Sequence, residues 1–202
     1  SAGSFVDIYG GEFCIDGIPI AMLDTVGNSK IVNVPAGAVL SGTLADGTPV
    51  AFSSQNSDVF ADGTLTLHAV QLPPPGPSIW NVPTDAAPVG LRQGQSLLLS
   101  NGGQIAGNFT AGWGSTVNIT GGQIGGNFEA VGAIVSISGG SVASGFDVFR
   151  GSVANISGGV VSGLAAQADS QVNITGGSVN SLVANSASLV NIAGGSVNNL
   201  TA

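Results

Sequence analysis

Residues 172–179 read Val-Asn-Ile-Thr-Gly-Gly-Ser-Val, and close variants of this segment recur along the C-terminal half of the chain. Its Gly-Gly doublet returns every 18 or 19 residues, beginning at Gly102, Gly121, Gly139, Gly158, Gly176 and Gly194. A fixed period of this length is the sequence signature of a solenoid, in which each repeat stacks on the one before it. The repeat therefore predicts coils of about 18 residues.

Apolar and polar residues alternate before each doublet, as in Val117-Asn118-Ile119 and Val172-Asn173-Ile174. Such alternation is typical of a strand with one buried face, and glycine turns the following corner because it accepts positive φ at low cost. A second short strand follows the doublet. A third column of small residues, eight positions before the Ile, contains Ala111, Val148, Ala166, Ala184 and Ala202, with Glu129 as an exception. We therefore predict an all-β fold, a narrow parallel β-solenoid (β-helix), over residues 91–202.

The central Asn of the repeat recurs at Asn118, Asn155, Asn173 and Asn191. Stacked identical amides hydrogen-bond along the axis of such a fold and hold its register. Several of these Asn residues also fit the glycosylation sequon. We favour the structural ladder, because the sequon falls on predicted strands and follows from the repeat itself.

The phase of the repeat is kept when the end of the chain is joined to its beginning. Counting on from Gly194 through Ala202 to Ser1, the next doublet, at Gly10, comes after 18 residues, and residues 188–195 align with residues 4–11. We therefore predict that residues 1–15 form a coil in phase with the C-terminal repeats. The chain is then one unit that associates head to tail, either as separate copies or within a covalent tandem array. The residues expected at this contact are Val6, Ile8, Phe13, Val190, Ile192, Val197 and Leu200.

The 18-residue rhythm is lost over residues 16–90. Strand-like runs at 30–34, 38–44, 48–53 and 64–70 are separated by turn signals such as Asp46-Gly47. This segment is predicted to be a β-rich insert or a set of wider coils. The proline-rich stretch at 72–77 predicts an extended linker, because successive prolines fix φ and donate no hydrogen bonds.

Charge and composition exclude several classes of partner. Only 7% of the residues are charged, and the formal net charge is −8. Nucleic acid and anionic membranes require clustered cations, so neither is an expected partner. No run of eighteen apolar residues is present, and membrane insertion is not expected. The single Cys14, in an apolar stretch, is expected to be a buried core residue.

Chemistry-bearing residues are sparse. His68 is the only histidine, and no Ser-His-Asp arrangement follows from spacing. The carboxylates Glu129, Asp147 and Asp169 fall on separate predicted coils, which is too sparse for a polysaccharide-cleaving site.

Calcium binding by the acidic group Asp46, Asp58 and Asp62 is an alternative to ordinary turn aspartates, but no loop of known spacing supports it. We expect a protein that is not an enzyme and has no catalytic, cofactor or metal site.

The Val-Asn-Ile-Ser/Thr-Gly-Gly-x-Val repeat resembles those of secreted or surface β-solenoid proteins of bacteria, which are adhesin-like or fibre-forming. The resemblance covers roughly residues 97–202 and 1–15 and carries over no functional residue. It implies an extracellular or cell-surface structural protein that assembles with itself as a filament or tandem-repeat fibre. The alternative is a carbohydrate-binding or polysaccharide-degrading β-helix domain of a surface adhesin, in which Tyr9, Trp80 and Trp113 could stack on glycans.

Overall fold

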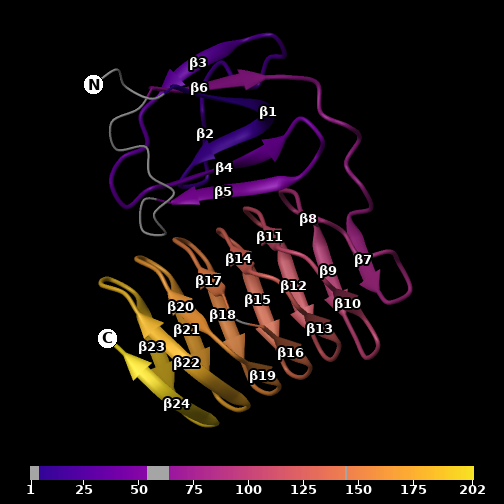
Figure 1. Ribbon diagram of the computed structural model, residues 1–202, viewed down its shortest axis with the longest axis vertical. Helices are drawn as coiled ribbons and strands as arrows, with labels where there is room; N and C mark the ends of the chain where they lie inside the picture. The colour runs from indigo at the N-terminus through magenta and orange to yellow at the C-terminus, as the bar shows by residue number, and fades with distance from the viewer. Residues whose placement is uncertain (1–4, 54–63, 144) are drawn as a thin grey trace. The chain divides into compact units, whose positions relative to one another are not determined.

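The computed structural model describes residues 5–53, 64–143 and 145–202, and these residues form strands and turns but no helix (Figure 1). The chain divides into two units, Ser1–Gly76 and Pro77–Ala202. The division falls at the end of the proline-rich stretch.

The second unit is a parallel β-solenoid in which each coil adds one strand to a seven-stranded sheet (Figure 1). This sheet contains β7 (Ile79–Val82), β9 (Ser96–Leu99), β12 (Thr116–Ile119), β15 (Ile134–Ile137), β18 (Val153–Ile156), β21 (Gln171–Ile174) and β23 (Leu189–Ile192). The other sides of the coils form an eleven-stranded sheet of β8 (Gly90–Leu91), β10 (Gln104–Ile105), β11 (Phe109–Ala111), β13 (Gln123–Ile124), β14 (Phe128–Ala130), β16 (Ser141–Val142), β17 (Phe146–Val148), β19 (Val160–Val161), β20 (Leu164–Ala166), β22 (Ser178–Ala184) and β24 (Ser196–Thr201).

Equivalent residues of successive coils stack directly on one another and fill the core. Val117 pairs with Val135, and Ile119 pairs with Ile137, in a ladder that continues through β18 and β21. The ring of Phe128 stacks on that of Phe146, with centroids 4.6 Å apart and an interplanar angle of 4°. These side chains are fully buried, so the predicted solenoid and its apolar columns are confirmed.

The Gly-Gly corners are required for two separate reasons. At Gly139, a Cβ would lie 2.5 Å from the carbonyl oxygen of Thr120 in the preceding coil. At Gly140, φ is +74°, and a Cβ would lie 2.6 Å from the backbone of Gly121. The first glycine thus permits the close approach of two coils, and the second also supplies the left-handed conformation.

The column of small residues has no exception. Ala130, and not Glu129, pairs with Ala111 on one side and Val148 on the other. Glu129 lies one position earlier, facing outward between Thr110 and Asp147. Counting eight positions back from Ile137 reaches Glu129 instead of Ala130. The reason is that the connection between β14 and β15 is one residue shorter than its counterpart between β17 and β18.

The first unit is a six-stranded mixed sheet in the order β3-β6-β1-β4-β5, with β2 paired to β1. Its strands are β1 (Phe5–Ile15), β2 (Ile18–Pro19), β3 (Ser29–Val32), β4 (Val39–Leu44), β5 (Pro49–Ser53) and β6 (Thr64–Ala69). β1 and β6 run parallel, whereas every other pairing is antiparallel. A separate core of residues such as Leu40, Leu65 and Leu67 lies beneath the sheet.

The prediction that residues 1–15 form a solenoid coil is wrong for the single chain. Residues 5–15 form one continuous strand, with β6 on one side and β4 on the other. Gly10 and Gly11 have no positive φ and make no corner. Gly10 instead lies so close to the Thr43 carbonyl of β4 that no Cβ would fit between them.

The solenoid also begins earlier than the predicted residue 91. β7 pairs in parallel with β9, matching Ile79 with Ser96 and Val82 with Leu99, so part of the predicted 16–90 insert belongs to the solenoid. The sequence conceals this coil because no Gly-Gly doublet marks its corner. The remaining predicted runs coincide within two residues with β3, β4, β5 and β6.

The corner geometry predicts a large difference between two Gly→Ala substitutions. Gly140→Ala forces an L-residue into positive φ, which costs about 1–2 kcal/mol, and adds the clash with Gly121. Gly107→Ala serves as the control, because a Cβ there meets no atom within 4 Å. Urea unfolding is expected to show a loss of at least about 2 kcal/mol for Gly140→Ala and less than about 0.5 kcal/mol for Gly107→Ala. Equal losses would contradict the close-approach explanation.

Candidate functional site

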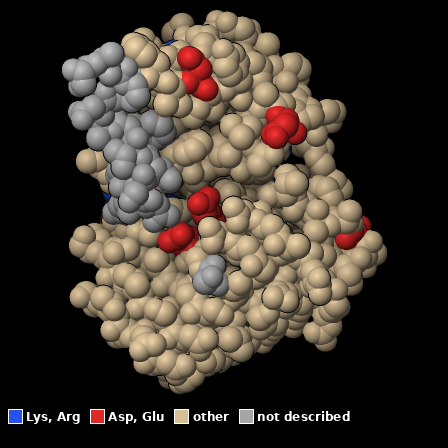
Figure 2. Space-filling model, viewed as in Figure 1, with Lys and Arg blue, Asp and Glu red and all other residues tan. Residues whose placement is uncertain are grey.

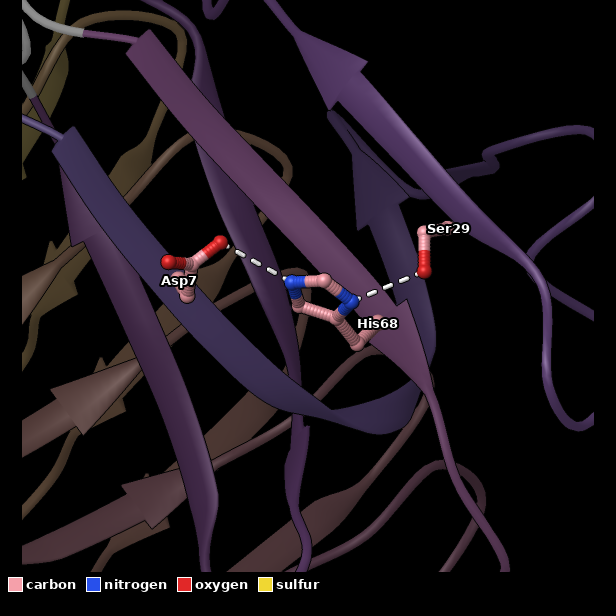
Figure 3. Close-up of polar contacts among 3 residues, drawn as sticks. All are labelled: Asp7, Ser29 and His68. Atoms are coloured by element: carbon pink, nitrogen blue, oxygen red, sulfur yellow. Dashed lines mark hydrogen bonds and ion pairs between the residues drawn. The ribbon is translucent and has the colours of Figure 1, made fainter.

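Three neighbouring strands of the first unit bring together a serine, a histidine and an aspartate (Figure 3). His68 lies on β6, directly opposite Ser29 of β3, and Asp7 lies on β1 opposite Thr66, two residues before His68. Ser29 Oγ is 2.8 Å from His68 Nδ1, and Asp7 Oδ1 is 2.9 Å from His68 Nε2. The imidazole therefore connects the strands on both sides of β6.

The partners determine the tautomer of the neutral imidazole. A carboxylate can only accept, so the hydrogen bond to Asp7 requires a proton on Nε2. Nδ1 then accepts a hydrogen bond that the Ser29 hydroxyl donates. In this state both nitrogens of His68 are engaged, and the plane of the ring is fixed.

Tyr9 stacks on this imidazole. The ring centroids of Tyr9 and His68 are 4.3 Å apart, and their planes differ by 9°. Tyr9 is nevertheless 53% exposed. The cluster thus holds an accessible aromatic ring in a defined orientation on the surface of the sheet.

The distances resemble those of a nucleophile, base and acid relay, but other features argue against hydrolysis. In serine hydrolases the Asp bonds Nδ1 and the Ser bonds Nε2, which is the reverse of the order found here. Such enzymes also need N–H donors for an oxyanion. The backbone N–H groups of Gly27 and Asn28, just before Ser29, are already donated to Ala69 and Thr25. The arrangement is better suited to bracing three strands and to binding than to acyl transfer.

Sequence reasoning could not find this cluster. Its members are separated by 39 and 61 positions in the chain. They meet only through the register of β1, β6 and β3, which includes a parallel pairing that the sequence does not indicate.

The predicted self-association residues fall into two groups. Val190 and Val197 are partly buried against the solenoid core, whereas Ile192 and Leu200 of the same coil are exposed. In the first unit, Val6 is exposed, but Ile8 and Phe13 belong to the buried core. Phe13 is therefore not available for association.

Among the open strand edges of the described residues, two lie at the predicted contact residues. β23 is the terminal strand of the seven-stranded sheet and pairs only with β21. Residues 5–8 of β1 pair only with β6, because the pairing with β4 begins at Gly10. Each edge presents backbone groups that another strand could use.

The solenoid carboxylates are closer together than the sequence suggests. Glu129 and Asp147 are adjacent in register, where Thr110 Oγ1 donates to Glu129 (3.1 Å) and Gln167 Nε2 donates to Asp147 (3.0 Å). Arg150 forms an ion pair with Asp169 at 2.6 Å.

The remaining chemistry-bearing residues have structural roles where they are described. Asp46 accepts a hydrogen bond from the Thr48 backbone (2.9 Å), and hydrogen bonds from Thr48 lower the pKa of the Asp46 carboxyl group. Asp58 and Asp62 lie outside the described residues.

Cys14 is buried as expected, and its burial, with the negative charge of Glu12, raises the pKa of the thiol. The described residues contain no group of three His, Cys, Asp or Glu side chains that could hold a metal ion.

No protein-family model, curated protein or solved structure matches this chain. Within the described residues, no helix has the length and apolar character needed to cross a membrane. The functional interpretation therefore depends on the geometry of the two units.

The cluster predicts a specific tautomer for the one histidine of the chain. At a pH where His68 is neutral, long-range ¹H–¹⁵N spectra are expected to show the proton on Nε2, because Asp7 accepts from that nitrogen. Asp7→Leu should release this preference, whereas Asp16→Leu should not, because Asp16 accepts from the Val39 backbone instead. A proton on Nδ1 in the unmodified chain would contradict the arrangement.

Proposed function

We propose that this chain is a structural unit of an extracellular β-solenoid filament or tandem-repeat fibre, in which β23 of one unit pairs with residues 5–8 of the next. The observation that carries this proposal is the match between two edges that are unpaired within the described part of the chain: the terminal edge of β23 and the N-terminal half of β1. The occupant of the β23 edge is thus a second unit of the same sequence, linked covalently or not.

The repeat fixes the register of this joint. Continuing the 18-residue spacing places Phe5 beside Leu189, Val6 beside Val190, and Ile8 beside Ile192. All coil strands in the seven-stranded sheet are parallel, and β1 is already parallel to its other neighbour, β6. A parallel β23-β1 pair therefore requires no change in the direction of β1.

The apolar ladder would also continue through the joint. Within the first unit, Val6 pairs with Leu65, and Ile8 pairs with Leu67. The column that includes Ile174 and Ile192 would thereby extend through Ile8 to Leu67, which is fully buried. Val190 and Val6 would be covered in the same way.

A second column supports the same phase. The corner before each strand from β9 to β23 of the seven-stranded sheet has a residue with positive φ, at Gly94, Gly114, Gly132, Gly151, Asp169 and Ala187. Eighteen positions beyond Ala187, in a following unit, the sequence has Gly3. Glycine adopts positive φ at the lowest cost, so it suits a continued corner at this place.

The joint is narrower than the sequence alone predicts. Because Gly10 and Gly11 lie within the continuous strand β1 and form no solenoid corner, only half a coil can continue the solenoid. Phe13 is buried in the first unit and does not meet Val197. The first unit then acts as a junction between one solenoid and the next.

The surface chemistry suits a long assembly. Figure 2 shows a face with few Asp or Glu residues, and the chain holds only three Lys or Arg residues. Exposed positions carry Ser, Thr and Asn, as in the amide ladder where Asn191 Nδ2 donates to Asn173 Oδ1 at 2.9 Å. A polar but weakly charged exterior suits a long assembly, because it limits repulsion between stacked units.

Disulfide trapping tests the register. In a Cys14→Ser background, Phe5→Cys combined with Leu189→Cys places the two thiols on adjacent strands of different units. Oxidation at high protein concentration is expected to give a ladder of linear oligomers on non-reducing gels. The matched control pairs Phe5→Cys with Ile134→Cys, because Ile134 belongs to the same column as Leu189 and is equally exposed (52% and 53%). Equal ladders from both pairs would remove the proposed joint.

A charge in the apolar column should block the same contact. Ile192→Asp places a carboxylate where the joint would bury it, which costs several kcal/mol. Sedimentation analysis is expected to show loss of concentration-dependent association for Ile192→Asp. Ile134→Asp, at a similarly exposed position on an inner coil, should associate like the unmodified chain. Unchanged association of Ile192→Asp would count against the proposal.

A further inference from the structure

The outer face of β1 and β6 combines aromatic rings with one carboxylate. Phe5, Asp7 and Tyr9 alternate with residues on the opposite side of β1, so all three project from the outer face. Phe5 is 77% exposed. On β6, Thr66 lies beside Asp7, and His68 lies beside Tyr9. The core residues Ile8, Leu65 and Leu67 are on the other side of the same strands.

Tyr9 is oriented before any ligand arrives. One side of its ring rests on His68, whose two nitrogens are held by Asp7 and Ser29. Fixing an aromatic ring in advance reduces the entropy lost when a partner stacks on it. The hydrogen bonds that hold His68 therefore do more than stabilise the sheet, because they also present a rigid, amphipathic ring to solvent.

The spacing of the two rings suits an extended ligand. Phe5 and Tyr9 are four residues apart on one strand, a distance on the order of 13 Å at the usual rise of a β-strand. Asp7 lies between them. One carboxylate oxygen accepts from His68, and a carboxylate has further lone pairs to accept from ligand hydroxyl groups.

We propose that this face binds a neutral saccharide chain that lies along β1, with Tyr9 and Phe5 stacking on sugar rings and Asp7 accepting hydroxyl hydrogen bonds. A sugar ring has an apolar C–H face and a rim of hydroxyl donors, which match an aromatic ring and a carboxylate. The face offers no Lys or Arg, and the chain has a net charge of −8, so an acidic polysaccharide is disfavoured. The head-to-tail joint would use the edge of β1, with Phe5 beside Leu189, whereas the saccharide would lie on the outer face of β1, so the two are tested separately.

The test uses the full chain and the two reporters that it provides, its single tyrosine and single histidine. NMR titrations with tetra- to hexasaccharides of glucose, mannose, xylose and galactose are expected to shift the Tyr9 ring signals for at least one series. Oligogalacturonate is the acidic comparison. An absence of shifts with every neutral series, or shifts with oligogalacturonate alone, would overturn the proposal.

Three variants separate stacking from general surface effects. Followed by calorimetry with the saccharide that binds, Tyr9→Ala is expected to weaken affinity about ten-fold or more, equivalent to about 1.4 kcal/mol. Tyr9→Phe should stay within about three-fold, because the ring is retained. Ile18→Ala removes an exposed apolar residue of β2 and should leave affinity unchanged. Equal binding by Tyr9→Ala and the unmodified chain would refute the site, whether or not the units assemble.

Discussion

The solenoid depends on the close approach of backbones at its glycine corners. The coils approach so closely there that Gly139 has no room for a Cβ against the Thr120 carbonyl. This contact forces the strands on either side into direct register, so that Ile119 lies on Ile137 and Phe128 on Phe146. The same register aligns the amides of Asn155, Asn173 and Asn191 for hydrogen bonding along the axis. Core packing and the polar ladder are therefore consequences of one steric constraint.

The sequence predicts the coils whose corners carry a Gly-Gly doublet, and it misses the coil whose corner lacks one. The doublets and the alternation around them were enough to predict the coils and their columns. The coil that contains Ile79 and Val82 was not found, because its corner has no doublet. Gly10 and Gly11 look like the other doublets, yet Gly10 lies against the Thr43 carbonyl of β4 and Gly11 lies against the side chain of Leu72. Local sequence cannot distinguish a glycine at a solenoid corner from a glycine inside a strand. In both places there is no room for a side chain, and only the neighbouring segment differs.

The polar cluster shows a second limit of sequence reasoning. The sequence around His68 does not indicate its contacts, since they are set by the parallel pairing of β6 with β1 and the antiparallel pairing of β6 with β3. Once β1 and β6 are parallel, Tyr9 and His68 are forced to be neighbours, and the imidazole reaches Asp7 and Ser29. A histidine with a purely local environment would look the same in the sequence.

Asp7 also explains how a solenoid can end at the proposed joint without losing its core. Asn173 donates to Asn155, and Asn191 donates to Asn173, so a residue that continued the ladder beyond Asn191 would have to be a donor. Asp7 occupies that position in the repeat, and a carboxylate cannot donate. Its own partner lies on the opposite side, at His68 Nε2. At the proposed joint the amide ladder would therefore stop at β1, while the apolar ladder would continue through Val6 and Ile8 to Leu65 and Leu67, with which they pair. The hydrogen-bonded ladder would end and the apolar packing would continue at the same strand, as a change from coils to a mixed sheet requires.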